Sequence, residues 1–163
     1  MRGRRPGLPL DPDTPGPVDH VLADVQTRGR FQFPGHLATG INWLRTAKGA
    51  IQALAVLEDP GYITFRPWSP HGEAVVQLRK TLIEAYAGGE TDVLPALRIL
   101  EDQNKRVSIT REFRITLTPE MLAHLNLSPA KPGVVYVWRM GDQLELLSTQ
   151  FRNEMIDKGH PLL

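Results

Sequence analysis

The chain carries the same succession of apolar patterns twice, and this repeat constrains its fold more than any other feature. In the C-terminal segment, Val107–Thr110 and Phe113–Leu117 alternate apolar and polar residues, which predicts two half-buried strands around a turn at 111–112. Thr118 is a good N-cap and Pro119 suits the first helical position, so a short helix is expected next. The segment therefore begins as a hairpin followed by a helix.

A second hairpin and a last helix complete this C-terminal unit. Val134–Trp138 is rich in residues that favour strands, and Leu144–Leu147 follows after a turn at 140–142. Ser148 or Thr149 then caps a final helix. The predicted order of elements is β-β-α-β-β-α.

The N-terminal segment repeats this order more loosely. Two strands flank a turn, a short helical stretch opens at Pro34, and a second hairpin precedes a helix with apolar residues at helical spacing. The expected elements are strands at Val21–Val25, Phe31–Phe33, Ile51–Leu57 and Tyr62–Phe65, and a helix from Gly72 to Tyr86.

The two segments can be aligned residue by residue around their first turns. Gly29–Pro34 aligns with Phe113–Thr118, so that Arg30 and Arg114 coincide. Any two β-β-α-β-β-α segments would look partly alike, but the shared order, spacing and arginine favour a true repeat. We therefore predict an α+β fold made of two pseudo-repeated β-β-α-β-β-α units.

The distribution of proline and glycine predicts how these units are divided. Five prolines and three glycines fall within residues 1–19, where little can pack, and Gly88–Gly89 predicts the end of a helix. We expect a disordered Pro/Gly-rich arm at 1–19, a first half at 20–87, a linker at 88–104, a second half at 105–157 and a tail at 158–163.

Composition excludes several classes of protein. The chain has 19 Lys and Arg against 18 Asp and Glu, so any binding of a polyanion must depend on local clusters of basic residues. The absence of cysteine excludes disulfides, thiolate metal sites and a cysteine nucleophile. No apolar stretch approaches the length of a membrane span. We expect a cytoplasmic protein without membrane partners.

Basic residues gather at the first hairpin of each half. Arginine suits DNA because its planar fork can bind a phosphate or a guanine edge bidentately, and a β-ribbon can enter the major groove. Arg28 and Arg111 lie nearest the turns and are expected to reach furthest, whereas Arg30 and Arg114 could instead pair with a carboxylate. Arginines on hairpins are also often only solvated. The candidate DNA-binding residues are Arg28, Arg30, Lys105, Arg106, Arg111 and Arg114.

The sequence contains no pattern that indicates an enzyme. The five histidines lack the spacing of a zinc site, and no glycine-rich phosphate loop follows a strand. His124 lies beside the apolar stripe of a helix, where a structural role is expected. We expect no catalytic activity, no metal or other cofactor, and no small-molecule substrate.

Two predicted strands are apolar on both faces. In Ile51–Leu57 and Val134–Trp138, neither set of alternating positions is consistently polar. One explanation is an obligate dimer or higher oligomer with interlocked hairpins. The other is a small barrel that buries both faces within one chain.

Three segments together resemble a known family. Gly29–Pro34 is close to the family's Gly-Arg-apolar-x-apolar-Pro junction, Arg114–Leu127 resembles its strand and helix, and Gly141–Glu154 resembles its closing hairpin and helix. This is the pattern of the SpoVT/AbrB swapped-hairpin superfamily and of its tandem form, the MraZ family. The resemblance covers residues 20–157. It implies a swapped-hairpin barrel and a bacterial, nucleoid-associated, DNA-binding transcriptional regulator that forms a dimer or ring.

The chain departs from that pattern at three positions. The family has an Asp four residues before its Arg in each copy, where this chain has Gln26 and Thr110. Asp102 and Arg106 have the family's spacing, but that alignment places Arg114 where the helix should begin. The glycine before the second arginine is replaced by Phe113. These differences indicate a divergent relative.

Two other functions are compatible with the resemblance. One is an antitoxin-type relative that binds a toxin, although the tail at Lys158–Leu163 is short for that role. The other is an oligomeric assembly protein that has lost DNA binding. Paired arginines in both hairpins favour the regulator, because an assembly protein has no need for them.

Overall fold

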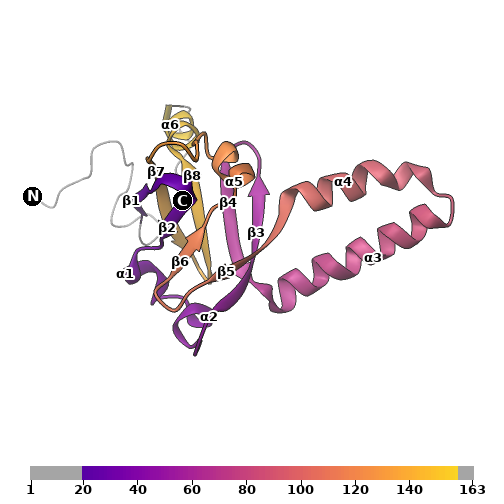
Figure 1. The fold of residues 1–163 in the computed structure, drawn as a ribbon, viewed down its shortest axis with the longest axis horizontal. Coiled ribbons are helices and arrows are strands. Elements are labelled where there is room, and N and C mark those ends of the chain that lie inside the picture. The colour runs from indigo at the N-terminus through magenta and orange to yellow at the C-terminus, as the bar shows by residue number, and fades with distance from the viewer. Residues whose placement is uncertain (1–19, 158–163) are drawn as a thin grey trace, which may run out of the picture.

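The structure is a computed structural model in which residues 20–157 are described. The expected N-terminal arm at 1–19 and tail at 158–163 lie outside these residues. Within them the fold is α+β, as predicted, and it combines one large antiparallel sheet with six α-helices (Figure 1).

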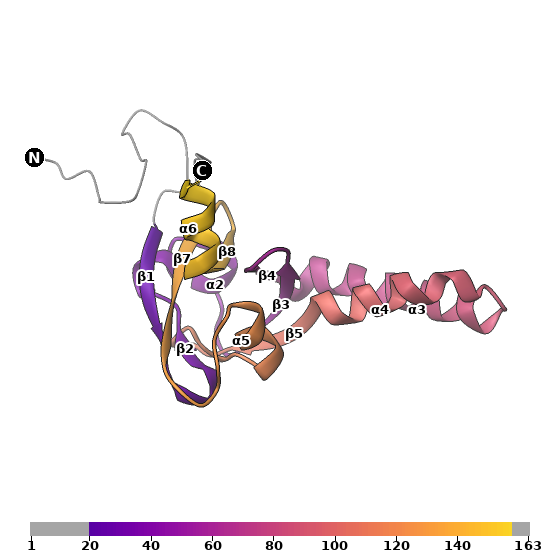
Figure 2. The same ribbon diagram turned by 90° about the horizontal axis from the view of Figure 1, so that it is seen from above.

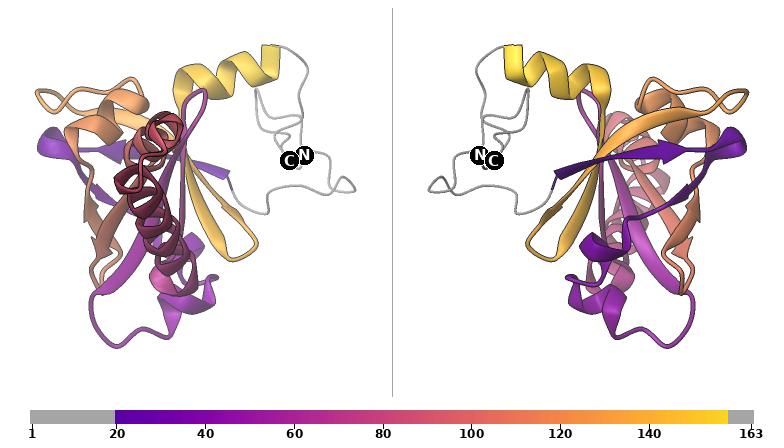
Figure 3. Two further views of the ribbon diagram at one scale, coloured as in Figure 1. Left: turned by 90° about the vertical axis from the view of Figure 1, so that its right-hand side faces the viewer. Right: turned by 90° about the vertical axis from the view of Figure 1, so that its left-hand side faces the viewer.

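The sheet has eight strands in the order β5-β3-β4-β8-β7-β1-β2-β6. Its two end strands, β5 and β6, are joined by the turn at 110–113, so the sheet curls into a nearly closed barrel (Figure 3). The strands are β1 His20–Val25, β2 Arg30–Gln32, β3 Ile51–Glu58, β4 Tyr62–Pro67, β5 Asn104–Ile109, β6 Arg114–Thr116, β7 Gly133–Met140 and β8 Gln143–Ser148.

The helices differ in how they relate to the barrel. Three short ones connect strands, α6 contacts β7 and β8, and α3 and α4 form a hairpin that projects from the barrel (Figures 1 and 2). The helices are α1 Gly35–Ala38, α2 Asn42–Arg45, α3 Glu73–Ala87, α4 Leu94–Gln103, α5 Pro119–His124 and α6 Thr149–Asp157. The predicted caps of the last two helices are confirmed, because Thr118 Oγ1 accepts a hydrogen bond from the Met121 N–H at 3.2 Å and Ser148 Oγ from the Phe151 N–H at 3.0 Å.

The strand pairing has an approximate twofold symmetry. β1 pairs with β7 from the other half of the chain, and β5 pairs in the same way with β3. Exchanging β1–β4 with β5–β8 leaves the circular strand order unchanged. Phe31 pairs with Ile115, and β4 pairs with β8. Because β1 of the first half pairs with a strand of the second half, and β5 of the second half with a strand of the first, neither half forms a separate sheet.

The barrel interior is filled by the inward residues of every strand. Phe31 and Phe33 meet edge to face with ring centroids 5.2 Å apart, and Phe33 meets Phe65 in the same way. Their counterparts Ile115 and Leu117 are equally buried. Such interdigitation of aromatic and aliphatic side chains is the main source of stability in a domain of this size.

A single chain buries the inner faces of the two apolar strands and part of their outer faces. Ala53, Leu54 and Ala55 of β3 are all buried, and α4 contacts this strand. On β7, Trp138 lies outside the barrel and forms a small second cluster with Leu147, which is also packed by Phe151 of α6. The barrel and its helices therefore account for most of this burial, whereas outer-face residues such as Val134 are only half-buried and the oligomer stays a prediction.

Two segments differ from the sequence expectations. The interval 88–104, expected to be a linker, contains a 3-10 turn at Thr91–Val93 and the whole of α4. Its Leu94, Leu97 and Leu100 follow helical spacing, and the burial of Leu97 with the half-burial of the other two explains why the segment is helical. The helical stretch after Pro34 is divided into α1 and α2 around Gly40.

Candidate nucleic-acid interface

The two predicted hairpin turns have the same hydrogen bonding. In the first, the Gln26 N–H donates to the Arg30 carbonyl at 2.8 Å and the Gly29 N–H to the Gln26 carbonyl at 3.2 Å. In the second, the Thr110 N–H donates to the Arg114 carbonyl at 3.0 Å and the Phe113 N–H to the Thr110 carbonyl at 2.9 Å. Each turn therefore sets one arginine at the start of the following strand.

These strands, β2 and β6, lie side by side and present both arginines on one surface. In the register, Arg30 is opposite Thr116 and Arg114 is opposite Gln32, with the Phe31–Ile115 pair between them. Since side chains alternate along a strand, burial of Phe31 and Ile115 turns their neighbours outward. The two arginines thus occupy symmetry-related positions on the outer face of the barrel.

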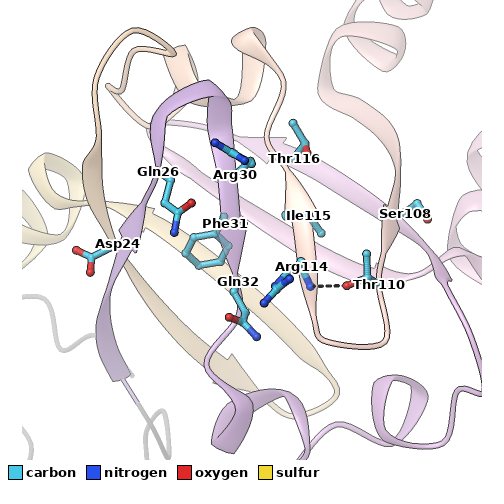
Figure 4. Close-up of a pocket in the computed structure, with 10 residues that line it drawn as sticks. All are labelled: Asp24, Gln26, Arg30, Phe31, Gln32, Ser108, Thr110, Arg114, Ile115 and Thr116. Carbon is cyan, nitrogen blue, oxygen red and sulfur yellow. Dashed lines mark hydrogen bonds between the residues drawn. The ribbon is translucent and has the colours of Figure 1, made fainter.

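A groove of about 760 Å³ runs over this face (Figure 4). Arg30 and Arg114 are exposed, and among the described residues no carboxylate lies within ion-pair distance of either. One carboxylate, that of Asp24, lines the groove from β1. The remaining polar lining is neutral. The groove is lined by Asp24, Gln26, Arg30, Phe31, Gln32, Ser108, Thr110, Arg114, Ile115 and Thr116.

Two positions at which the SpoVT/AbrB pattern, which the sequence resembles, has aspartates also lie in this groove. Gln26 and Thr110 both line it, next to the turns that carry Arg30 and Arg114. The Thr110 hydroxyl accepts a hydrogen bond from the Arg114 N–H at 3.1 Å (Figure 4), so it supports the turn as a carboxylate could. Because Gln26 and Thr110 are neutral, they add no negative charge beside the arginines.

Lys105 and Arg106 have other partners and do not line the groove. Lys105 Nζ lies 2.9 Å from Glu120 Oε2. Arg106 donates from Nε to Gln52 Oε1 at 3.0 Å, and its guanidinium carbon lies 4.4 Å from the centre of the Trp68 ring. Arg106 nevertheless shares the outward face of β5 with Ser108, a lining residue, and so it flanks the groove.

The two turn arginines lie at opposite ends of the β2–β6 pair. Arg28 has a left-handed backbone conformation with φ 64°, and its N–H donates to the Pro129 carbonyl at 2.9 Å. Arg111 is exposed in the turn after β5. Because β2 and β6 are antiparallel, the turns point away from each other along the groove. That these side chains reach a ligand stays a prediction.

Sequence reasoning missed the neutral polar residues of the groove. Gln32, Ser108 and Thr116 line it, and each occupies an outward position next to a core residue. Gln32 also donates from Nε2 to the Glu112 carbonyl at 2.8 Å, which ties β2 to the second turn. The alternation of apolar and polar residues along β2, β5 and β6 was the signal that could have identified them.

Outside the groove, the polar side chains of His124 and Glu145 have hydrogen-bond partners within the chain. Among residues 20–157, no group of three or more His, Asp and Glu residues could hold a metal ion, and no helix is long and apolar enough to cross a membrane. His124 Nε2 lies 2.6 Å from the Glu58 carbonyl oxygen. Glu145 is buried on β8, where burial raises the pKa of its carboxyl although Trp138 and Gln143 donate hydrogen bonds to it.

Comparison with known proteins adds no homologue to this description. Neither protein-family models nor curated proteins give a match to the chain. The features of this protein that bear on its function are therefore the groove and the symmetry of the strand pairing.

Proposed function

We propose that this protein is a DNA-binding transcriptional regulator of the SpoVT/AbrB type, a divergent relative of the MraZ family. The observation that carries the proposal is the pair Arg30 and Arg114. The strand register brings both arginines to one outward groove, related by an approximate twofold axis and, among the described residues, without a carboxylate partner.

The topology supports this assignment. In a swapped-hairpin barrel, the first hairpin of each unit inserts between strands of the other unit. Here β1 pairs with β7 and β5 with β3, and the halves exchange without changing the strand order. The chain would then contain within itself the two units that single-repeat relatives bring together as a dimer.

The groove would bind double-stranded DNA through its arginines and neutral donors. Arg30 and Arg114 would contact phosphates or base edges near the symmetry axis, Arg28 and Arg111 would contact the backbone at the two ends, and Arg106 and Lys105 would make weaker flanking contacts. A net charge of +1 is compatible with this, because the basic residues are concentrated at one face. No cofactor is required, and regulation would follow from occupation of the promoter.

A salt titration of binding tests the proposal. The full chain and a fluorescent duplex taken from upstream of its own gene are followed by anisotropy as salt increases. The logarithm of affinity should fall with the logarithm of salt concentration, with a slope of about 0.9 for each phosphate neutralised. Failure of the wild-type protein to bind duplex DNA even at low salt would overturn the regulator.

Matched variants locate the contact. Arg30→Gln with Arg114→Gln should reduce the salt slope by about two, whereas Arg45→Gln, an exposed arginine on α2, should leave it unchanged. Arg28→Glu with Arg111→Glu should abolish binding without changing the mass of the protein in solution. If Arg45→Gln weakened binding as much as the groove variants, the groove would not be the DNA site.

A further inference from the structure

The hairpin of α3 and α4, residues 73–103, is exposed to an unusual degree. We call this hairpin the arm, which is distinct from the N-terminal segment 1–19. It projects from the barrel, with its tip at the Gly88–Val93 turn (Figures 1 and 2). α3 has 15 residues and spans about 22 Å, yet none of its side chains is buried, and in α4 only Leu97 is. Two helices that pack mainly against each other have few ways to bury their apolar residues.

One side of the arm carries apolar residues that the chain leaves uncovered. Val76 and Ile83 are seven residues apart, Tyr86 follows after one more turn, and their exposed fractions are 45%, 37% and 43%. Seven residues are close to two helical turns, so these side chains lie on one side of α3. A cluster of exposed apolar residues is typical of an interaction surface.

The same side continues onto α4 through an ion pair. Arg79, between Val76 and Ile83 in the sequence, donates from Nε to Glu101 Oε2 of α4 at 2.7 Å. Arg98 lies three residues before Glu101 and so shares its side of the helix. We call the surface formed by Val76, Arg79, Ile83, Tyr86, Arg98 and Glu101 the arm face.

Charge along the arm is segregated. From Glu84 to Leu97, around the tip, the chain has Glu84, Glu90 and Asp92 and no lysine or arginine. Lys80 and Arg98, in the middle of the arm, are exposed, and among the described residues neither has a carboxylate within ion-pair distance. The arm therefore presents an acidic tip and a basic middle, each without its complement in the described part of the chain.

We propose that a second copy of this chain covers the arm face, with the two arms antiparallel and Ile83 near the twofold axis. In that arrangement the acidic tip of each arm lies against Lys80 and Arg98 of the other. Val76, Ile83 and Tyr86 pack between the helices, and the two hairpins form a four-helix layer. An isologous interface uses the same surface of both copies. Here that one surface supplies both the apolar stripe and the opposite charges.

This interface is separate from the DNA groove. No residue of α3 or α4 lines the groove, so the pairing leaves a barrel at each end of the joined arms with its groove open. The inference does not depend on DNA binding, and its test contains no DNA. If both proposals hold, each assembly carries two grooves, which multiplies a modest affinity by avidity.

Light scattering on the full chain tests the pairing. The wild type should have twice the 18.2 kDa mass of one chain, or a multiple of that value. Ile83→Glu should give the single-chain mass with an unchanged circular dichroism spectrum, because the Ile83 side chain is exposed within one chain. Ile99→Glu is the matched control, since Ile99 is 56% exposed and lies on the opposite side of α4. This control should keep the wild-type mass.

A charge exchange identifies the occupant. Glu90→Lys with Asp92→Lys, and separately Lys80→Glu with Arg98→Glu, should each weaken self-association by about tenfold or more, because tip and middle then repel. Mixing these two variants should restore the assembly as a heterodimer in which both contacts are again complementary. A single-chain mass for the wild type at high micromolar concentration would overturn the proposal. So would a loss of assembly in Ile99→Glu but not in Ile83→Glu, or failure of the two charge variants to assemble when mixed.

Discussion

The two halves of the chain agree inside the barrel and differ outside it. Phe31 and Ile115 face each other across the symmetry axis and are both buried, whereas the turn residues Arg28 and Glu112 occupy matching positions with opposite charge. Packing requires agreement inside, but nothing in the core requires it outside. The outward arginine shared by both halves, at 30 and 114, is therefore the part of the repeat that packing does not explain.

The two turns also differ in their backbones. In the first, Arg28 and Gly29 both have positive φ, at 64° and 76°, whereas in the second only Phe113 does, at 64°. The hydrogen bonds are nevertheless the same, and the Gly29 and Phe113 carbonyls accept from Leu117 and Phe33 respectively. Similar closure of the barrel can thus be reached by two local conformations, of which only the first needs glycine.

The largest expected effect on stability is at Gly29, in the turn that needs glycine. A Cβ added there would lie 2.2 Å from the backbone oxygen of Leu117, in a conformation that L side chains rarely adopt. Gly29→Ala should lower the free energy of unfolding by about 3 kcal/mol or more, because the β2–β6 contact must move. Urea denaturation measures the change.

Gly141 provides the matched control for this substitution. Its φ is +61° and a Cβ added there would meet no atom within 4 Å, so only backbone strain remains. Gly141→Ala should cost about 1 kcal/mol. Equal losses in the two variants would mean that the close approach to Leu117 does not constrain the first turn.

The next effect concerns the helices that follow each first hairpin. Thr118 caps α5 through its hydroxyl, whereas Pro34, at the matching position, begins α1 without a side-chain cap. Thr118→Ala should therefore cost about 1 kcal/mol in the free energy of unfolding, and Thr118→Ser should cost little because it keeps the hydroxyl. If serine and alanine were equally destabilising, the methyl group and not the cap would be responsible.

Local sequence signals predicted most of the fold. The hairpins, the cap at Thr118 and the start of α6 are each visible as period-two alternation or as a capping residue. The pairing of β1 with β7 and of β5 with β3 does not follow from those signals, since register between distant strands depends on the closed barrel. Interlocked hairpins are indicated by the family resemblance and by the two strands that are apolar on both faces, and neither signal gives the register.

The candidate site was also predicted only in part, because it too depends on contacts between distant strands. Arg30 and Arg114 are identified by their matching positions, and alternation along the strands marks Gln32 and Ser108 as outward, but no local pattern shows that the two hairpins share one groove, because they are far apart in the sequence. Lys105 has its own partner, Glu120, in α5. Helix α4 was missed because Pro95 and the preceding glycines suggest a loop, although proline is favourable in a first helical turn.

The third expected effect is a pH dependence of stability at Glu145 of β8, which pairs with Thr64 of β4. Both side chains are buried, but only the glutamate titrates. Burial raises the pKa of Glu145 above its usual 4.5. Below the usual value the carboxyl is protonated in both states. As pH rises, the unfolded chain ionises first, so the protein loses stability until the folded pKa is passed.

Glu145→Gln isolates this effect. The variant has no carboxyl at position 145, so its free energy of unfolding, relative to the wild type, should increase as the pH rises from the usual carboxyl pKa of 4.5 towards neutral. Urea denaturation of both proteins across that range measures the difference. A difference that stays constant with pH would contradict a raised pKa for this carboxyl.

The smallest expected effect on stability makes the two turns alike. Glu112→Arg gives the second turn the charge that Arg28 gives the first, and because Glu112 is exposed the free energy of unfolding should change by less than about 0.5 kcal/mol. If both turns contact DNA at the ends of the groove, affinity should rise by about two- to tenfold, and the salt slope should increase by about one. Anisotropy measures both quantities, with Glu154→Arg, an exposed residue of α6, as the control for net charge. A rise in both variants would reflect overall charge alone, whereas a rise confined to Glu112→Arg would extend the symmetry of the barrel to its DNA contacts.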